Sequence, residues 1–125
     1  MSDLSTLNYA GENFAFAPHW DGANLSATFT GTADLMAVVP LAEFLKGLGQ
    51  DVSRLRSRRV RLDLTRLEFI NSSCLKAFVA FVVRMKDGQR PVHVEFLTDP
   101  GFPWQGRAVA PIARISPETV CVVRS

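Results

Sequence analysis

Two adjacent serines, Ser72 and Ser73, are the residues whose type and position most clearly suggest chemistry in this chain. They follow an apolar, strand-like stretch and open a helix-like one, so we expect their hydroxyls at a helix N-terminus. The first turn of a helix carries unpaired backbone N–H groups and a partial positive charge, which favour a bound phosphate. The pattern is consistent with serines that accept a phosphate. The alternative is that Ser72, Ser73 or the preceding Asn71 only caps the helix.

The two cysteines suggest less. Cys74 falls in the first turn of the expected helix, where the helix dipole can lower the pKa of a thiol and make it a redox sensor. A small packed residue is the commoner role for a lone cysteine beside apolar neighbours, and we favour it. Cys121 alternates with Val120 and Val122 and is interpreted as part of a strand. No Cys-x-x-Cys spacing is present, so the sequence predicts no metal site.

The motifs of common enzymes are missing from the sequence. His19 and His93 are isolated from acidic and cysteine clusters, and there is neither a Ser–His–Asp signature nor a glycine-rich phosphate loop. We therefore predict a protein without catalytic residues or a cofactor, and not an enzyme.

Residues 54–61, RLRSRRVR, hold five arginines. Nucleic-acid binding is one interpretation of such a run. No aromatic residues interleave with the arginines for base stacking, and Arg59 and Arg61 alternate with apolar residues beside Asp63. We favour a solvent-exposed basic segment that leads into a strand and helps to steer a protein partner, and we expect no nucleic-acid binding.

Composition predicts one globular domain, residues 1–125. Hydrophobic residues make up 47% of the 125 residues, and the net charge is +2. These values favour a single core and exclude a disordered chain. The N-terminus lacks the pattern of a signal peptide, and the longest apolar run, 77–83, is too short to cross a bilayer. We expect a cytoplasmic protein that does not enter a membrane.

Periodicity predicts a mixed α/β fold. A strand near 14–20 and a strand at 25–30 form an N-terminal hairpin, after which helices alternate with strands in the order β-β-α-β-α-β-α-β. Residues 1–10 are expected to be a flexible segment. We expect the first helix to begin close to Pro40 and to end at Gly47 and Gly49. The remaining predicted elements are strands at 59–64, 92–97 and 119–123, and helices at 35–48, 72–86 and 106–115.

The helix at 72–86 has a wide apolar side. A stripe formed by Leu75, Phe78, Val79 and Val82 is predicted to face the sheet, flanked by Cys74, Ala77 and Phe81. This flank exceeds what one core-facing stripe needs, so Ala77 and Phe81 are a candidate partner surface beside Ser72. The alternative is that the neighbouring helix covers the flank.

Residues 62–79, LDLTRLEFINSSCLKAFV, resemble the signature of STAS domains, the fold of bacterial anti-sigma factor antagonists. In that signature an apolar strand carries an aspartate, matched by Asp63, and Asp-Ser-Ser/Thr-Gly then opens a helix. Residues 71–74, Asn-Ser-Ser-Cys, match that second element, with Asn71 in place of the aspartate and Cys74 in place of the glycine. A weaker match is Gly-Thr-Ala-Asp-Leu at 31–35, which resembles the family's approach to its first helix.

The resemblance implies a single STAS-like domain and a regulatory role in transcription. Ser72 would be the phosphoacceptor, with Ser73 the second choice, and Asp63, Asn71 and Cys74 would shape the site. The unmodified domain would bind an anti-sigma-type serine kinase, phosphorylation would release it, and a phosphatase would reset the switch. A homodimer is left open.

Two other functional classes stay open beside this phosphoprotein. One is a constitutive scaffold or self-assembling subunit without phosphoregulation. The other is a binder of a small apolar ligand, which needs a cavity between the helices and the sheet.

Overall fold

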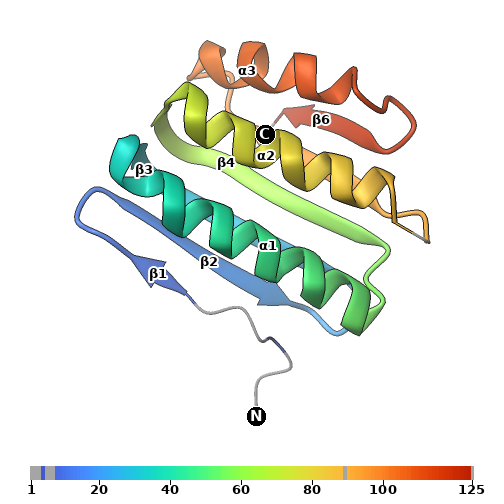
Figure 1. Ribbon diagram of the computed structural model, residues 1–125. Coiled ribbons are helices and arrows are strands. Elements are labelled where there is room, and N and C mark those ends of the chain that lie inside the picture. The colour runs from blue at the N-terminus through green and yellow to red at the C-terminus, as the bar shows by residue number, and fades with distance from the viewer. Residues whose placement is uncertain (1–3, 5–7, 89, 125) are drawn as a thin grey trace.

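The fold is one mixed six-stranded sheet with three α-helices. The computed structural model describes residue 4, residues 8–88 and residues 90–124. Most of the N-terminal segment predicted to be flexible, residues 1–3 and 5–7, lies outside the described residues. The predicted α/β class, the N-terminal hairpin and the order of the predicted elements are confirmed, and a short additional strand, β1, precedes them (Figure 1).

The strands lie in the sheet in the order in which they occur in the sequence. The first three pair antiparallel and the last four pair parallel, with β3 belonging to both groups. Their bounds are β1 Tyr9–Ala10, β2 Phe14–Trp20, β3 Leu25–Ala33, β4 Arg59–Ile70, β5 His93–Thr98 and β6 Val120–Arg124.

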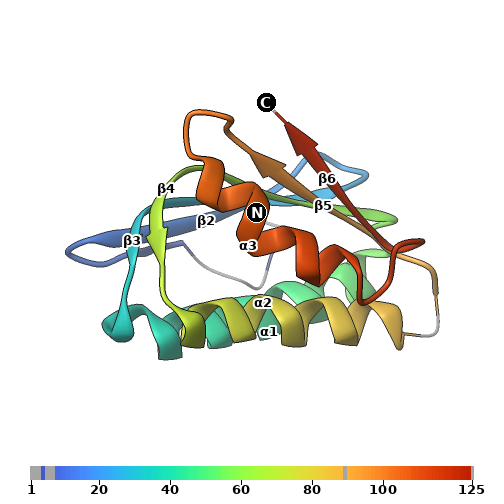
Figure 2. The same cartoon turned by 90° about the horizontal axis from the view of Figure 1, so that it is seen from above.

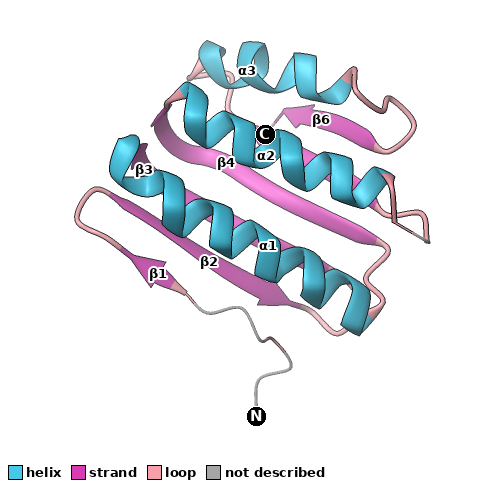
Figure 3. Ribbon diagram, in the orientation of Figure 1, coloured by secondary structure: helices cyan, strands magenta, loops and turns pink. Residues whose placement is uncertain are grey.

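All three α-helices lie on one face of the sheet (Figure 2). Crossovers between parallel strands are right-handed, and here each one moves to the next strand in the same direction, so each helix falls on the same side. The helices are α1 Val38–Leu55, α2 Ser72–Lys86 and α3 Pro103–Ala113, and a 3-10 turn, η1 Leu35–Ala37, precedes α1 (Figure 3).

The end predicted for the first helix is wrong. Helix α1 begins near Pro40, as expected, but continues through Gly47 and Gly49 to Leu55. Gly49 faces α2 across a close helix–helix contact: a Cβ on Gly49 would lie 3.4 Å from the Met85 methyl carbon and 3.8 Å from the Phe81 ring, which is ordinary van der Waals contact. Glycine often marks the end of a helix, but Gly49 lies inside α1, where its small size allows α2 to pack closely.

Strand β4 is also longer than predicted, because it continues past residue 64 to Ile70. Its pairing with β3 shifts register twice, first between Thr28 and Thr30. At that shift the Asp63 carboxylate accepts hydrogen bonds from the backbone N–H of Thr65, at 2.9 Å, and from its hydroxyl, at 2.6 Å. Asp63 therefore stabilises an irregularity inside the strand.

Helix α2 has the predicted bounds but a different buried face. Its buried residues are Cys74, Phe78, Phe81, Val82 and Met85. Phe81 has no exposed surface, and Leu75 and Val79 are only partly buried. The prediction of a partner surface at Ala77 and Phe81 is therefore wrong, because α1 covers that flank.

Helix α3 is fastened to the sheet by a buried glutamine. The Gln105 amide nitrogen donates to the carbonyl oxygens of Leu64, at 2.7 Å, and Leu67, at 2.8 Å. Its side-chain oxygen accepts from the backbone N–H of Asp99, at 2.8 Å. One side chain thus joins the start of α3 to the interior of β4 and to the end of β5.

Candidate functional site at the start of helix α2

Asn71 is the residue that caps α2. Its backbone is extended, its side-chain oxygen accepts a hydrogen bond from the backbone N–H of Cys74 at 2.8 Å, and its own N–H donates to the carbonyl oxygen of Ala33 at 2.9 Å. These bonds fix the start of α2 against the end of β3. Because Asn71 supplies the cap, neither serine is needed for it.

Ser72 and Ser73 are the first two residues of α2, and both are exposed. Neither hydroxyl forms a hydrogen bond with another residue in the part of the chain that the structure describes. The hydroxyls are therefore open to solvent beside the positive end of the helix. Of the three residues that the capping alternative named, Asn71 is the cap and the two serines are not. The exposed serine hydroxyls are accessible to a modifying enzyme.

Cys74 is completely buried beneath the start of η1. Its Sγ–H donates to the carbonyl oxygen of Asp34 at 3.4 Å. Burial raises the pKa of this thiol, and the nearby negative charge of Asp34 raises it further. These effects outweigh the helix dipole, so Cys74 is a packed, protonated residue and does not suit a redox sensor.

The two cysteines are expected to differ sharply in reactivity. Cys121 is exposed, and its pKa is also raised, first by partial desolvation and then by Glu95. In the native protein a thiol reagent at pH 8 should label one cysteine, Cys121, and in denaturant it should label both. The rate at Cys121 should rise by about tenfold per pH unit below its pKa, since the thiolate is the reacting form.

Labelling followed by peptide mass spectrometry measures this difference, and a Cys121→Ser variant is the control. Rapid labelling of Cys74 in the folded variant would contradict the burial described above.

An apolar surface lies on the same edge of the molecule as the two serines. We call it the apolar rim; it consists of Leu35, Met36, Val39 and Phe69, whose exposed fractions are 75%, 83%, 64% and 51%. The bonds from Asn71 to Ala33 and from Cys74 to Asp34 hold η1 against the start of α2. Figure 1 shows the start of α1 beside the start of α2. Large exposed apolar side chains gathered in this way are typical of a protein-binding surface.

Sequence reasoning did not identify the apolar rim. The signal was available in the first helix, because Leu35, Met36 and Val39 are apolar but lie outside the repeating positions that α1 buries against the sheet. Phe69 gave no comparable signal, since its exposure depends on where β4 ends.

Asp63, which was also proposed to shape the site, lies away from the start of α2. Asp63 lies eight residues before Asn71, about 26 Å away at the usual strand rise. It supports the strand and takes no part in the first turn of α2.

No family model matches the sequence of this chain, and no curated protein sequence matches it significantly. None of the helices in the described residues is long and apolar enough to span a bilayer. The described residues also contain no group of three or more histidine, cysteine or acidic side chains suited to a metal ion.

Proposed function

We propose that this chain is a STAS-like regulatory binding module that a serine phosphorylation switches off. The partner is an anti-sigma-type serine kinase that docks on the apolar rim and phosphorylates Ser72, with Ser73 as the second choice, and a phosphatase reverses the modification. The observation that carries the proposal is the pair of exposed serines beside the apolar rim, at a helix start that Asn71 already caps.

The charge of a phosphate explains how the switch works. A phosphoserine carries about −1.5 to −2 charges at neutral pH. The start of α2 stabilises this charge by about 0.3–1 kcal/mol, so the modified domain keeps its fold. A partner that covers the apolar rim would have to bury the same charge, which is costly without a counter-ion. Phosphorylation therefore acts on docking with little rearrangement inside the domain.

Asn71 distinguishes this site from the family pattern. A neutral amide caps α2 as an aspartate would, but it does not repel a phosphate on the adjacent Ser72. A phosphate on Ser72 would therefore meet less electrostatic repulsion here than in a domain whose cap is an aspartate. Any kinase that reads a carboxylate here must use another contact.

Phosphorylation is tested with the purified protein, the anti-sigma-type serine kinase of its own cell, and ATP. Mass spectrometry is expected to find one phosphate on Ser72, and Ser72→Ala should remove it or shift it to Ser73. The absence of phosphate from both serines would contradict the switch.

Docking is tested separately by a pull-down with the same kinase. Ser72→Asp is expected to weaken binding at least tenfold, while Ser72→Ala keeps it. Equal binding of the Ser72→Asp variant would favour the alternative, a constitutive scaffold or self-assembling subunit.

A further inference from the structure

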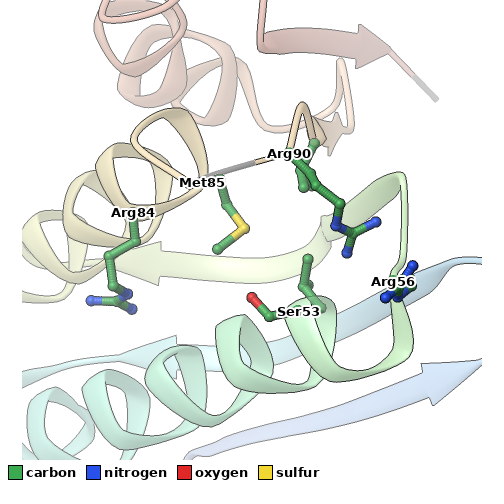
Figure 4. A pocket seen from close by; sticks show the side chains of 8 residues that line it. Ser53, Arg56, Arg84, Met85 and Arg90 are labelled. Carbon is green, nitrogen blue, oxygen red and sulfur yellow. The ribbon is translucent and has the colours of Figure 1, made fainter.

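A second candidate site lies at the other end of α2, in a cleft between the ends of α1 and α2. Its volume is about 400 Å3, within the usual range of roughly 300–1,000 Å3 for small-ligand sites. We call it the arginine cleft; its lining residues are Val52, Ser53, Arg56, Arg84, Met85, Gly88, Arg90 and Val92. Figure 4 shows Arg56 and Arg90 at one end of the cleft, and Arg84 beyond Ser53 and Met85.

The positive charge of this cleft is not compensated. The lining contains three arginines and no acidic residue. Within residues 8–88 and 90–124, none of Arg56, Arg84 and Arg90 forms an ion pair with a carboxylate. Three guanidinium groups around one concavity repel each other, and an anion that bridges them would relieve this repulsion.

The arginine-rich run of the sequence is divided by the fold, and only part of it reaches the cleft. Arg54 pairs with Asp51 at 3.0 Å, and Arg61 pairs with Glu95 at 2.7 Å. Arg56 lines the cleft instead and also lines a second hollow. The basic surface thus continues from the cleft to this hollow, whose other lining residues are Ala23, Asn24, Arg58, Arg59 and His93.

The backbone at Arg56 determines how its side chain leaves the end of α1. Arg56 ends α1 with φ at 56°, in the left-handed region, and is the only described non-glycine residue with positive φ. Glycine is the usual residue at such a position because a Cβ is strained there. An arginine held in this conformation, with its side chain at the cleft, fits a role for the side chain itself.

The neighbouring Ser57 keeps this turn in place. Its backbone N–H bonds to the carbonyl oxygen of Val52 at 3.1 Å, its hydroxyl donates to the carbonyl oxygen of Arg59 at 2.6 Å, and the hydroxyl oxygen accepts from the N–H of Leu25 at 3.0 Å. Ser57 is completely buried. The direction in which Arg56 leaves the backbone is thus fixed by the fold.

From this arrangement we propose that the arginine cleft binds a small anion that carries two or more phosphate groups. Arginine matches phosphate oxygens through paired N–H donors. One phosphate group carries about −2 charges at most, so two or more are needed to balance three arginines. The Arg84 side chain lies over Gly49: its Nε is 3.9 Å from where a Cβ on Gly49 would be. Gly49 precedes Arg56 by seven residues, which is about 10 Å along α1. An elongated anion is required to reach both.

The probe for this site is inorganic tripolyphosphate, measured by isothermal titration calorimetry with the full chain at low salt. Saturable binding is expected, with pyrophosphate weaker and single phosphate weakest. Binding should fall when salt is raised from 50 to 200 mM, because part of the attraction is screened.

Two variants locate the binding. Arg90→Gln and Arg56→Gly should each weaken tripolyphosphate binding by about tenfold or more, the effect of one charge-assisted contact. Arg56→Gly also removes the left-handed strain, so its Tm should equal or exceed that of the wild type, which excludes misfolding as the cause. Arg107→Gln, on the exposed side of α3, is the matched control and should bind as the wild type does.

Three outcomes would overturn the site: no binding of tripolyphosphate at millimolar concentration, equal loss in the Arg107→Gln control, or binding of a single-stranded oligonucleotide but not of tripolyphosphate. All are independent of whether Ser72 is phosphorylated.

Discussion

Replacement of Gln105 by leucine is expected to lower the free energy of unfolding by about 3 kcal/mol. Leucine has a similar volume but removes three buried hydrogen bonds, with the carbonyl oxygens of Leu64 and Leu67 and the N–H of Asp99. Each buried backbone group left without a partner costs about 1–3 kcal/mol, which outweighs the gain from burying an apolar side chain. Urea denaturation followed by circular dichroism measures the change, with an unchanged m-value as the sign of two-state unfolding.

Gln50→Leu is the matched control. Gln50 is exposed on α1, so this variant makes the same glutamine-to-leucine change at a position in contact with water. Its effect should stay within about 0.5 kcal/mol. A loss below about 1 kcal/mol in Gln105→Leu would show that the three hydrogen bonds do not fasten α3 to the sheet. The result bears on function, since Leu67 lies only a few residues before the capped start of α2.

Local signals predicted the start of α2 well. A strand, a capping residue and an apolar helical repeat follow each other without a break between residues 60 and 86, and each of these signals acts over a few residues. The bounds of α2 and the exposure of Ser72 and Ser73 follow from them.

Tertiary contacts explain the errors. Gly47 and Gly49 signal the end of a helix, yet the packing of α2 against α1 favours a small residue at Gly49 and keeps the helix intact. The buried side of α2 was misplaced for the same reason, since an apolar flank beside the core stripe has the same sequence pattern whether a partner or a neighbouring helix covers it. The arginine cleft was not predicted, because Arg84 and Arg90 are distant from Arg56 in the sequence and line the same cleft only in the folded chain.

The two proposed sites lie at opposite ends of one helix. Ser72 begins α2, and the arginine cleft lies beside its last turns, about 20 Å away at the usual helical rise. The positive end of the helix dipole faces the serines, while at the negative end arginines supply the attraction for an anion. Arg84 and Met85, both on α2, line the cleft. Because about 20 Å of helix separates the two sites, we expect a substitution at one to leave binding at the other unchanged.

The same phenylalanine-to-alanine substitution is expected to have different effects on stability in the core and on the proposed partner surface. Phe81→Ala should lower the free energy of unfolding by about 3–5 kcal/mol, because Phe81 is completely buried against α1 and its removal leaves a cavity. Phe69→Ala should cost less than about 1 kcal/mol, since half of that side chain is already in water. Denaturant unfolding of the two variants measures this difference.

Binding should show the reverse order. Phe69→Ala removes part of the apolar rim and is expected to weaken kinase binding about tenfold or more in a pull-down, the loss typical of an exposed aromatic anchor. Val122→Ala, at a partly exposed apolar residue of β6 outside the apolar rim, serves as the surface control and should bind normally. If Phe69→Ala binds the kinase as well as Val122→Ala does, Phe69 is not a binding residue. Loss of binding in both variants would show that the loss is not specific to the apolar rim.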